Sequence, residues 1–318
     1  MELIDKMFSG DQIALARLIT ILENQSQSVP EIMKAIYPHI GNAYLLGITG
    51  PPGGGKSTLV DELTSIIRRK GLTVGIVAVD PTSPFSGGAL LGDRVRMQKH
   101  YLDDGVFIRS MATRGSFGGL TNAAKCVIRL LDAFGKDIII VETVGVGQTE
   151  LDIIKAVDTV LVVLVPEAGD TIQTMKAGLM EIADIFVVNK ADREGAKQMA
   201  GELRTMLNDS QKQTYWQVPV METQANNGIG IDELYAEIEH HRDVLLQTGN
   251  LSVRRRRQRE SELAEIVERR IKDKIVERIR KEGKFSVLVK KIADGEIDPY
   301  SASNEIFSDK EVLRDCFL

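Results

Sequence analysis

Cysteine and histidine are scarce in this chain of 318 residues. The two cysteines, Cys126 and Cys316, are far apart and lack the spacing of metal ligands. We therefore expect both to be reduced thiols. The four histidines form no His-rich tract, so the sequence contains no segment typical of metal storage.

Long apolar runs are also missing, because none approaches the roughly 18 residues that a membrane-spanning helix needs. The first 12 residues carry acidic side chains and have neither a signal-peptide core nor an Arg- and Ser-rich transit pattern. We expect a cytoplasmic protein without a membrane partner. A net charge of -5 and a pI near 5.6 argue against a protein that binds nucleic acid over its whole surface.

The pattern of apolar residues divides the chain into three expected parts: an N-terminal helical extension over 1–43, an α/β domain over 44–249, and a C-terminal helical arm over 250–318. In the middle part, short β-branched runs alternate with longer amphipathic stretches, which is typical of a mostly parallel sheet covered by helices. The predicted strands are Tyr44–Thr49, Val74–Val79, Ile138–Val141, Val160–Val165 and Ile185–Val188.

The C-terminal part opens with four arginines, Arg254–Arg257, and continues as a highly charged segment with apolar residues three or four positions apart. This spacing predicts one long helix with an apolar stripe, and Gly283 is a plausible stop. The stripe could pack on its own domain or form a contact with a partner or a second copy, and the pattern does not choose between them. Its residues are Leu263, Ile266, Val267, Ile271, Ile275 and Ile279.

A phosphate-binding motif follows the first predicted strand. The segment 50–57 matches GxxxxGK[ST], and a helical pattern begins directly after it, which is the context that the motif requires. Glycines let backbone N–H groups and the helix N-terminus face the phosphates, while Lys56 is expected on the β- and γ-phosphates and Ser57 on Mg²⁺. The predicted nucleotide-binding residues here are Gly50, Pro51, Pro52, Gly53, Gly54, Gly55, Lys56, Ser57 and Thr58.

A guanine-recognition motif, Asn189-Lys190-Ala191-Asp192, follows the last predicted strand. The Asp192 carboxylate can accept the N1–H and the 2-amino hydrogens of guanine, a pair of donors that adenine lacks. Asn189 is expected to brace the loop and to reach the edge of the base, and the stem of Lys190 to cover one face of the ring. A second segment, Thr223, Gln224 and Ala225, fits the loop that contacts guanine O6 through a backbone N–H.

Acidic residues near strand ends predict a magnesium site. Glu142, followed by Gly145, stands where P-loop GTPases have Asp-x-x-Gly, so the acid is expected to hold the metal and the glycine to sense the γ-phosphate. Asp80 and Asp93 are further candidates, because carboxylates that converge on phosphates need a cation. The predicted metal ligands are Ser57, Asp80, Asp93 and Glu142.

The glutamine that follows the sensing glycine in Ras-like proteins is replaced here by Val146, and Gln148 is the candidate substitute. We therefore predict slow intrinsic hydrolysis that needs a partner or a rearrangement to complete the site. The loops 81–92 and 113–119 are candidates for nucleotide-dependent switches. The predicted catalytic residues are Lys56, Asp93, Glu142, Gly145 and Gln148.

Together these motifs resemble the GTPase chaperones of adenosylcobalamin-dependent acyl-CoA mutases, the methylmalonyl-CoA mutase-associated group often labelled arginine/ornithine transport ATPase-like. The resemblance covers nearly the whole chain. Besides the motifs above, its most specific segments are Val79–Gly88, Leu91–Arg94, Arg109–Gly115, Glu142–Gln148 and Pro166–Gln173.

The resemblance implies a P-loop G domain of the SIMIBI class with a C-terminal helical dimerisation arm, hence a homodimer. It also implies a Mg²⁺-dependent GTPase that binds GTP and GDP, gates the loading of adenosylcobalamin into a partner mutase and helps rescue the inactivated mutase. The segment Pro166–Gln173 is similar to the family's additional switch. The cobalamin belongs to the partner.

Two other functions stay open at this point. A GTPase metallochaperone belongs to the same broad class, although the chain has no His-rich tract and no Cys-x-Cys-Cys-type site. A kinase or ATPase linked to amino-acid transport is the other, although the base motif predicts a preference for guanine.

Overall fold

The computed structural model describes residues 2–24, 26–80, 98–112, 120–143, 152–166, 179–209, 215–281 and 283–308. It divides the chain into two compact units, residues 1–254 and 255–318, and each unit is described by itself.

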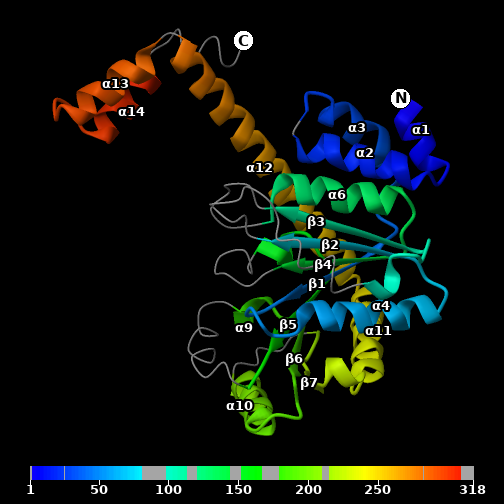
Figure 1. Cartoon of the computed structure of the whole chain (residues 1–318). Coiled ribbons are helices and arrows are strands. Elements are labelled where there is room, and N and C mark those ends of the chain that lie inside the picture. Colours follow the sequence, from blue (N-terminus) through cyan, green and yellow to red (C-terminus); the bar gives the residue numbers. More distant parts are fainter. Residues whose placement is uncertain are drawn as a thin grey trace. The chain divides into compact units, whose positions relative to one another are not determined.

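The first unit is built on a parallel sheet, which the described residues form from seven strands in the order β3-β2-β4-β1-β5-β6-β7 (Figure 1). This confirms the predicted α/β fold class, and all five predicted strands are present. The strands are β1 (Tyr44–Thr49), β2 (Val74–Asp80), β3 (Val106–Ala112), β4 (Ile138–Thr143), β5 (Thr159–Leu164), β6 (Ile185–Asn189) and β7 (Val220–Thr223).

The two strands at the edges of the sheet, β3 and β7, are absent from the five predicted runs. Both are only partly buried: β3 contains Arg109 and Ser110 at half-exposed positions, and β7 has four residues, of which two are half-exposed. An edge strand is covered less than a central one, so its sequence does not read as a continuous apolar run.

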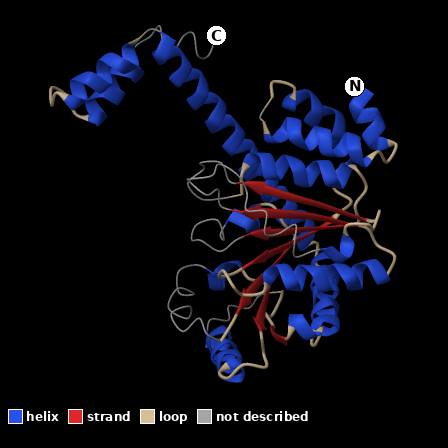
Figure 2. Cartoon of the chain, viewed as in Figure 1, coloured by secondary structure: helices blue, strands red, loops and turns tan. Residues whose placement is uncertain are grey.

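Helices cover both faces of the sheet, as Figure 2 shows. In the first unit they are α1 (Glu2–Phe8), α2 (Gln12–Glu23), α3 (Val29–Ile36), α4 (Lys56–Arg69), α6 (Asn122–Ala133), α9 (Leu179–Ile182), α10 (Ala196–Asp209) and α11 (Ile231–Gln247). Short 3₁₀ turns lie at η1 (Tyr37–His39), η2 (Gln98–His100), η3 (Ile153–Lys155) and η4 (Ala225–Asn227).

Successive residues of the strands enter two different hydrophobic cores. In β4, Ile139 and Val141 pack with residues of α2, α6 and α10, whereas Ile138 and Ile140 pack with residues of α4 and α11. Side chains of a strand point alternately to the two faces, so a sheet covered on both sides requires apolar residues at every position.

The N-terminal helices share the core of the face that α6 covers. Asp11 caps α2 by accepting hydrogen bonds from the backbone N–H groups of Ile13 and Ala14. The buried Asp132 carboxylate at the end of α6 accepts three backbone N–H groups, those of residues 41, 42 and 43, and so fixes the connection into β1.

The second unit contains the part of α12 (Asn250–Lys281) that follows residue 254, together with α13 (Lys284–Ala293) and α14 (Pro299–Ser308). Ile275 and Ile279 of the predicted stripe pack with Ile306 of α14. Farther toward the start of the helix the stripe is exposed, at Leu263, Val267 and Ile271. Among the helices that the structure describes, none is long and apolar enough to cross a membrane.

Candidate functional site

The predicted phosphate loop lies between the end of β1 and the start of α4, at the carboxyl ends of the parallel strands. Three of its glycines, Gly50, Gly53 and Gly55, have φ angles of 136°, 75° and 83°, a region that disfavours residues with a side chain. A Cβ atom at Gly50 would collide with the Val163 carbonyl of β5. The glycines are therefore required by the path of the backbone.

Lys56 is buried at the first position of α4, and its ammonium group is held by the loop itself. Its Nζ donates to the carbonyl oxygens of Gly50 at 2.8 Å and Pro51 at 2.9 Å. These bonds place the positive charge inside the curve of the loop. An anion in the loop would be neutralised by this charge together with the N-terminus of α4.

Two of the predicted metal ligands meet beside the loop. The Ser57 hydroxyl donates to Oε1 of Glu142 at 2.7 Å, although the two residues are 85 positions apart in the sequence. Both side chains are buried. The parallel pairing of β1 with β4 causes the meeting, because it aligns Glu142 with Ile48, two positions before the phosphate loop begins at Gly50.

The donor set fits a magnesium ion, since a hydroxyl and a carboxylate are hard oxygen ligands and a buried carboxylate is stabilised by a cation. Within the described ranges no group of three or more acidic, histidine or cysteine side chains could hold a metal by itself. Asp80 ends β2, and its side chain is not among those described. Asp93 lies outside the described residues, so the complete ligand set stays a prediction.

The base-recognition motif begins at the last residue of β6, and Asn189 connects three segments. Its Nδ2 donates to the Gly54 carbonyl at 2.9 Å, and its Oδ1 accepts from the Thr223 hydroxyl and the Ala225 N–H, each at 3.1 Å. Asn189 is buried. It therefore ties the phosphate loop to the segment 223–225, the bracing role that the sequence predicts.

The Ala225 N–H, the expected donor to guanine O6, is already engaged by Asn189 in this structure. Gln224 is engaged as well, since its N–H donates to the carbonyl of Ile229 and its side chain accepts from Asn227. A hydrogen bond from the Ala225 N–H to guanine O6 would require this N–H to be shared with Asn189 or released by it.

Lys190 and Asp192 lie on a tight turn at the end of β6. Lys190 has a φ of 56° and is the residue other than glycine with a positive φ among those described, and the Ala191 N–H donates to the Thr223 carbonyl at 2.9 Å. Asp192 is exposed. Its carboxylate is therefore in contact with water and loses that contact only when a base covers it. Any preference for one base over another arises at that step.

Three of the predicted catalytic residues, Asp93, Gly145 and Gln148, lie outside the described residues, as do the switch candidates 81–92 and 113–119 and most of Pro166–Gln173. Sequence reasoning also missed a pair at the strand ends. The Thr143 hydroxyl donates to the Thr49 hydroxyl at 2.9 Å, and both residues are buried. Each of them directly precedes a glycine-containing segment of the sequence, which is the signal that could have revealed the pair.

Known proteins of one family are similar to this chain over most of its length. The family model "Methylmalonyl Co-A mutase-associated GTPase MeaB" matches residues 15–280. A putative GTPase of Pyrococcus abyssi is 53% identical over 315 residues, which cover 98% of this chain and 96% of that protein. The mouse protein "Methylmalonic aciduria type A homolog, mitochondrial" is 28% identical, with 95% and 78% of the two chains covered.

The crystal structure of an LAO/AO transport system kinase has the same fold, with a TM-score of 0.71, 26% identity and 96% of each chain covered. The match extends over the N-terminal helices, the sheet and the C-terminal part of the chain. With a family match over most of the sequence and the phosphate loop in its expected place, this chain belongs to the methylmalonyl-CoA mutase-associated GTPase family, MeaB, and is a GTPase.

Proposed function

We propose that this GTPase is a magnesium-dependent chaperone of an adenosylcobalamin-dependent acyl-CoA mutase, in which GTP turnover gates cofactor loading and protects or reactivates the mutase. The observation that carries this proposal is the family match over residues 15–280, since that family is described as associated with methylmalonyl-CoA mutase. The similarity to the mouse methylmalonic aciduria protein supports the same client class.

The chain's own residues supply binding and charge neutralisation. The N-terminus of α4 and the buried Lys56 would neutralise the phosphates of GTP or GDP, while Ser57 and Glu142 would hold magnesium. The metal, when bound, would neutralise charge on the phosphate oxygens. Asp80 and Asp93 complete the proposed ligand set, and Gly145 and Gln148 are proposed at the γ-phosphate.

Guanine specificity is assigned to Asp192. Because this carboxylate is exposed and Asn189 holds the turn before it, a guanine base could reach its two acceptor oxygens without a change in the strand. The alternative base xanthine has an acceptor oxygen where guanine has its 2-amino group. Asp192→Asn replaces an acceptor by a donor and should move the preference from guanine to xanthine nucleotides.

The second unit is proposed to form a homodimer contact. Leu263, Val267 and Ile271 lie one turn apart on α12 and are exposed, and the same stripe continues into the packed residues Ile275 and Ile279. A second copy of the helix would bury this stripe. A cytoplasmic location and the absence of nucleic-acid and membrane partners stay predictions.

The deciding experiment is GTP hydrolysis by the purified protein with Mg²⁺, with and without a candidate cobalamin mutase. Slow turnover that the mutase stimulates would support the chaperone function. Asp192→Asn should lose most GTP turnover and gain turnover of xanthosine triphosphate. ATP is the matched control nucleotide, and turnover of ATP faster than GTP would contradict the base assignment.

Turnover that no tested mutase changes, together with no nucleotide-sensitive binding to a cognate mutase, would contradict the chaperone proposal. The GTPase assignment would not be affected by that result, because it rests on the chain's own residues and on its family.

A further inference from the structure

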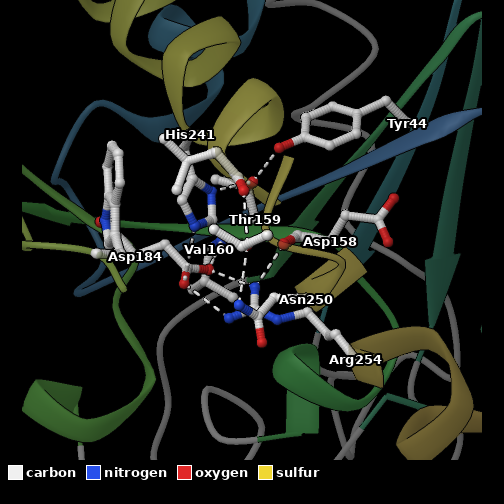
Figure 3. Close-up of polar contacts among 11 residues, drawn as sticks. Tyr44, Asp158, Thr159, Val160, Asp184, His241, Asn250 and Arg254 are labelled. Atoms are coloured by element: carbon white, nitrogen blue, oxygen red, sulfur yellow. Dashed lines mark hydrogen bonds and ion pairs between the residues drawn. The ribbon is translucent and has the colours of Figure 1, made fainter. Parts of the chain in front are cut away.

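A buried polar cluster lies at the amino ends of the central strands, at the opposite end of the sheet from the phosphate loop. Figure 3 shows its members, which come from the starts of β1, β5 and β6, from α11 and from the start of α12. We call it the α12 anchor. It consists of Tyr44, Asp158, Thr159, Asp184, His241 and Arg254.

Arg254 is the centre of the α12 anchor. Its two terminal nitrogens donate to the two carboxylate oxygens of Asp184 at 2.7 and 2.8 Å, and one of them also donates to the carbonyl oxygen of Asp158. The side chain of Arg254 is 18% exposed and that of Asp184 is 8% exposed. Burial lowers the pKa of Arg254, but the hydrogen bonds and the charge of Asp184 outweigh it, so the net change in its pKa is upward. The guanidinium therefore stays charged and holds a planar, two-point contact.

The acceptor Asp184 is itself held by the sheet. Its Oδ2 accepts the Val160 N–H of β5 at 2.8 Å, and its backbone carbonyl accepts the Trp216 indole N–H at 2.7 Å. The His241 Nε2 lies 3.5 Å from Asp184 Oδ1. The carboxylate thus cannot follow Arg254 if the helix moves, unless β5 or β6 moves with it.

A chain of hydroxyl groups supports the far side of His241. Its Nδ1 lies 2.7 Å from the Thr159 hydroxyl, which is in turn hydrogen bonded to the Tyr44 hydroxyl. With the proton on Nε2, the neutral imidazole accepts from Thr159 and faces Asp184 with its N–H. The residues at the starts of β1 and β5 and directly before β6 are therefore joined to one another and to Arg254.

The same strands contact the nucleotide loops at their other ends. In β5 the Val163 carbonyl lies against Gly50, so closely that a Cβ atom there would collide with it. In β6 the side chain of Asn189 donates to the Gly54 carbonyl. The strands have six and five residues, so each spans a distance of about 16–20 Å as one stiff element.

We propose that Arg254 and Asp184 are positioning residues that couple the nucleotide loops to the start of α12, residues 250–254, through β5 and β6. A change in the phosphate loop that shifts Val163 or Asn189 is carried to Asp158 and Asp184 at the other ends of these strands, and Arg254 transfers it to the first turn of α12. Packed strands move as units rather than deform, which makes such a shift transmissible. α12 continues without interruption into the second unit. A change at the start of this helix that depends on the bound nucleotide would therefore be passed to that unit.

The first test uses trypsin, because the four arginines Arg254–Arg257 lie on the first turns of α12. Arg254→Lys keeps the charge that neutralises Asp184 but removes the two-point contact. We expect it to raise the rate of cleavage within 254–257 at least tenfold. The matched control is Glu260→Gln, which breaks an exposed pair with Arg256, with side chains 62% and 82% exposed, leaves every trypsin site in place and should change the rate less than twofold.

The second test measures the coupling. Hydrogen exchange of the backbone amides of residues 250–258 is compared between the protein with GDP and the protein with a non-hydrolysable GTP analogue, both with Mg²⁺. We expect at least a threefold difference in exchange rate in the unaltered protein and less than a 1.5-fold difference in Arg254→Lys. The affinity of the variant for GDP should stay within twofold of the original.

Two results would overturn the proposal: equal exchange in the two nucleotide states of the unaltered protein, or a difference that persists in Arg254→Lys. Asp184→Asn provides a second variant, since it removes the charge from the other side of the contact and leaves every trypsin site in place. If both variants lost GDP binding together with the nucleotide effect, the anchor would be needed only for folding and the coupling would be refuted.

Discussion

The two ends of the central sheet differ in how their polar residues are arranged along the chain. At the carboxyl ends, the site is built from short consecutive motifs, and its backbone is shaped by glycines such as Gly50 and Gly55. At the amino ends, the α12 anchor joins single residues that are up to about two hundred positions apart, such as Tyr44 and Arg254. Loops that bind a ligand must be exposed and locally shaped, whereas a buried ion pair needs only one residue from each element.

This difference leads us to expect different consequences of mutation at the two ends. Residues of the nucleotide site should affect activity with little loss of stability, whereas residues of the α12 anchor should affect stability with little loss of nucleotide affinity. The following predictions test this expectation, from the largest effect to the smallest.

Asp184→Ala should cause the largest loss of stability. It leaves the Arg254 guanidinium buried without its carboxylate and removes the acceptor of the Val160 N–H, so the free energy of unfolding should fall by about 3–5 kcal/mol. Denaturant titration followed by the fluorescence of Trp216 would measure it. The exposed Asp232, which lies 3.7 Å from Arg69, is the control, and its alanine variant should lose at most about 0.5 kcal/mol. Equal losses in both variants would show that the contact of Asp184 with Arg254 stabilises the fold no more than an exposed pair does.

Lys56→Ala should cause the largest loss of activity. It removes the buried positive charge of the phosphate loop, and GTP hydrolysis should fall by about 10²–10³-fold. The free energy of unfolding should change by less than about 1 kcal/mol, because the bonds of Lys56 to the loop carbonyls are replaced by water. The alanine variant of Lys6, an exposed residue paired with Glu2, is the control for both measurements.

A change of pH should act on the amino ends of the strands through His241. The pKa of His241 is lowered to about 4, and burial is the largest cause. Asp184 raises this pKa by a smaller amount, and Arg254 and His240 lower it further. As the pH falls below about 6.5 the unfolded state takes up the proton first, so stability is lost between pH 6.5 and 4, by about 2–3 kcal/mol from this group. The contribution of His241 to the free energy of unfolding should be fully present above pH 6.5.

His241→Gln should flatten this part of the dependence of unfolding free energy on pH, while the variant of the exposed neighbour, His240→Gln, should retain it. Unfolding midpoints measured at intervals from pH 7 to pH 4.5 would separate the two. An unchanged slope in His241→Gln would assign the acid sensitivity to carboxylates instead.

Thr143→Val should have the smallest effect. It removes the hydrogen bond to Thr49 and leaves that hydroxyl buried, which should cost about 1 kcal/mol of unfolding free energy. Thermal unfolding would detect this as a shift of the midpoint by about 2–4 °C. A loss as large as that of Asp184→Ala would show that the nucleotide end also stabilises the fold.

Much of the fold was predictable because buried parallel strands have a simple signature. The five central runs contain apolar residues at almost every position, and the structure places each of them in the sheet. The edge strands β3 and β7 were not predicted, since half-exposed residues such as Arg109 and Glu222 interrupt the apolar pattern. The structure brings Ser57 together with Glu142, whereas the metal site to which both are assigned stays a prediction.

The sequence by itself determined the class of ligand, the family and the α/β fold, because glycines, a lysine and a guanine motif must occur at set spacings for a backbone loop to bind phosphates and a base. Only the tertiary structure decided that Asn189 joins the phosphate loop to segment 223–225 and that Arg254 is bound to Asp184. The reason is physical: a single arginine in a run of four carries no local sign of its partner. Its contact depends on the register of β5 and β6 and on the position at which α12 begins.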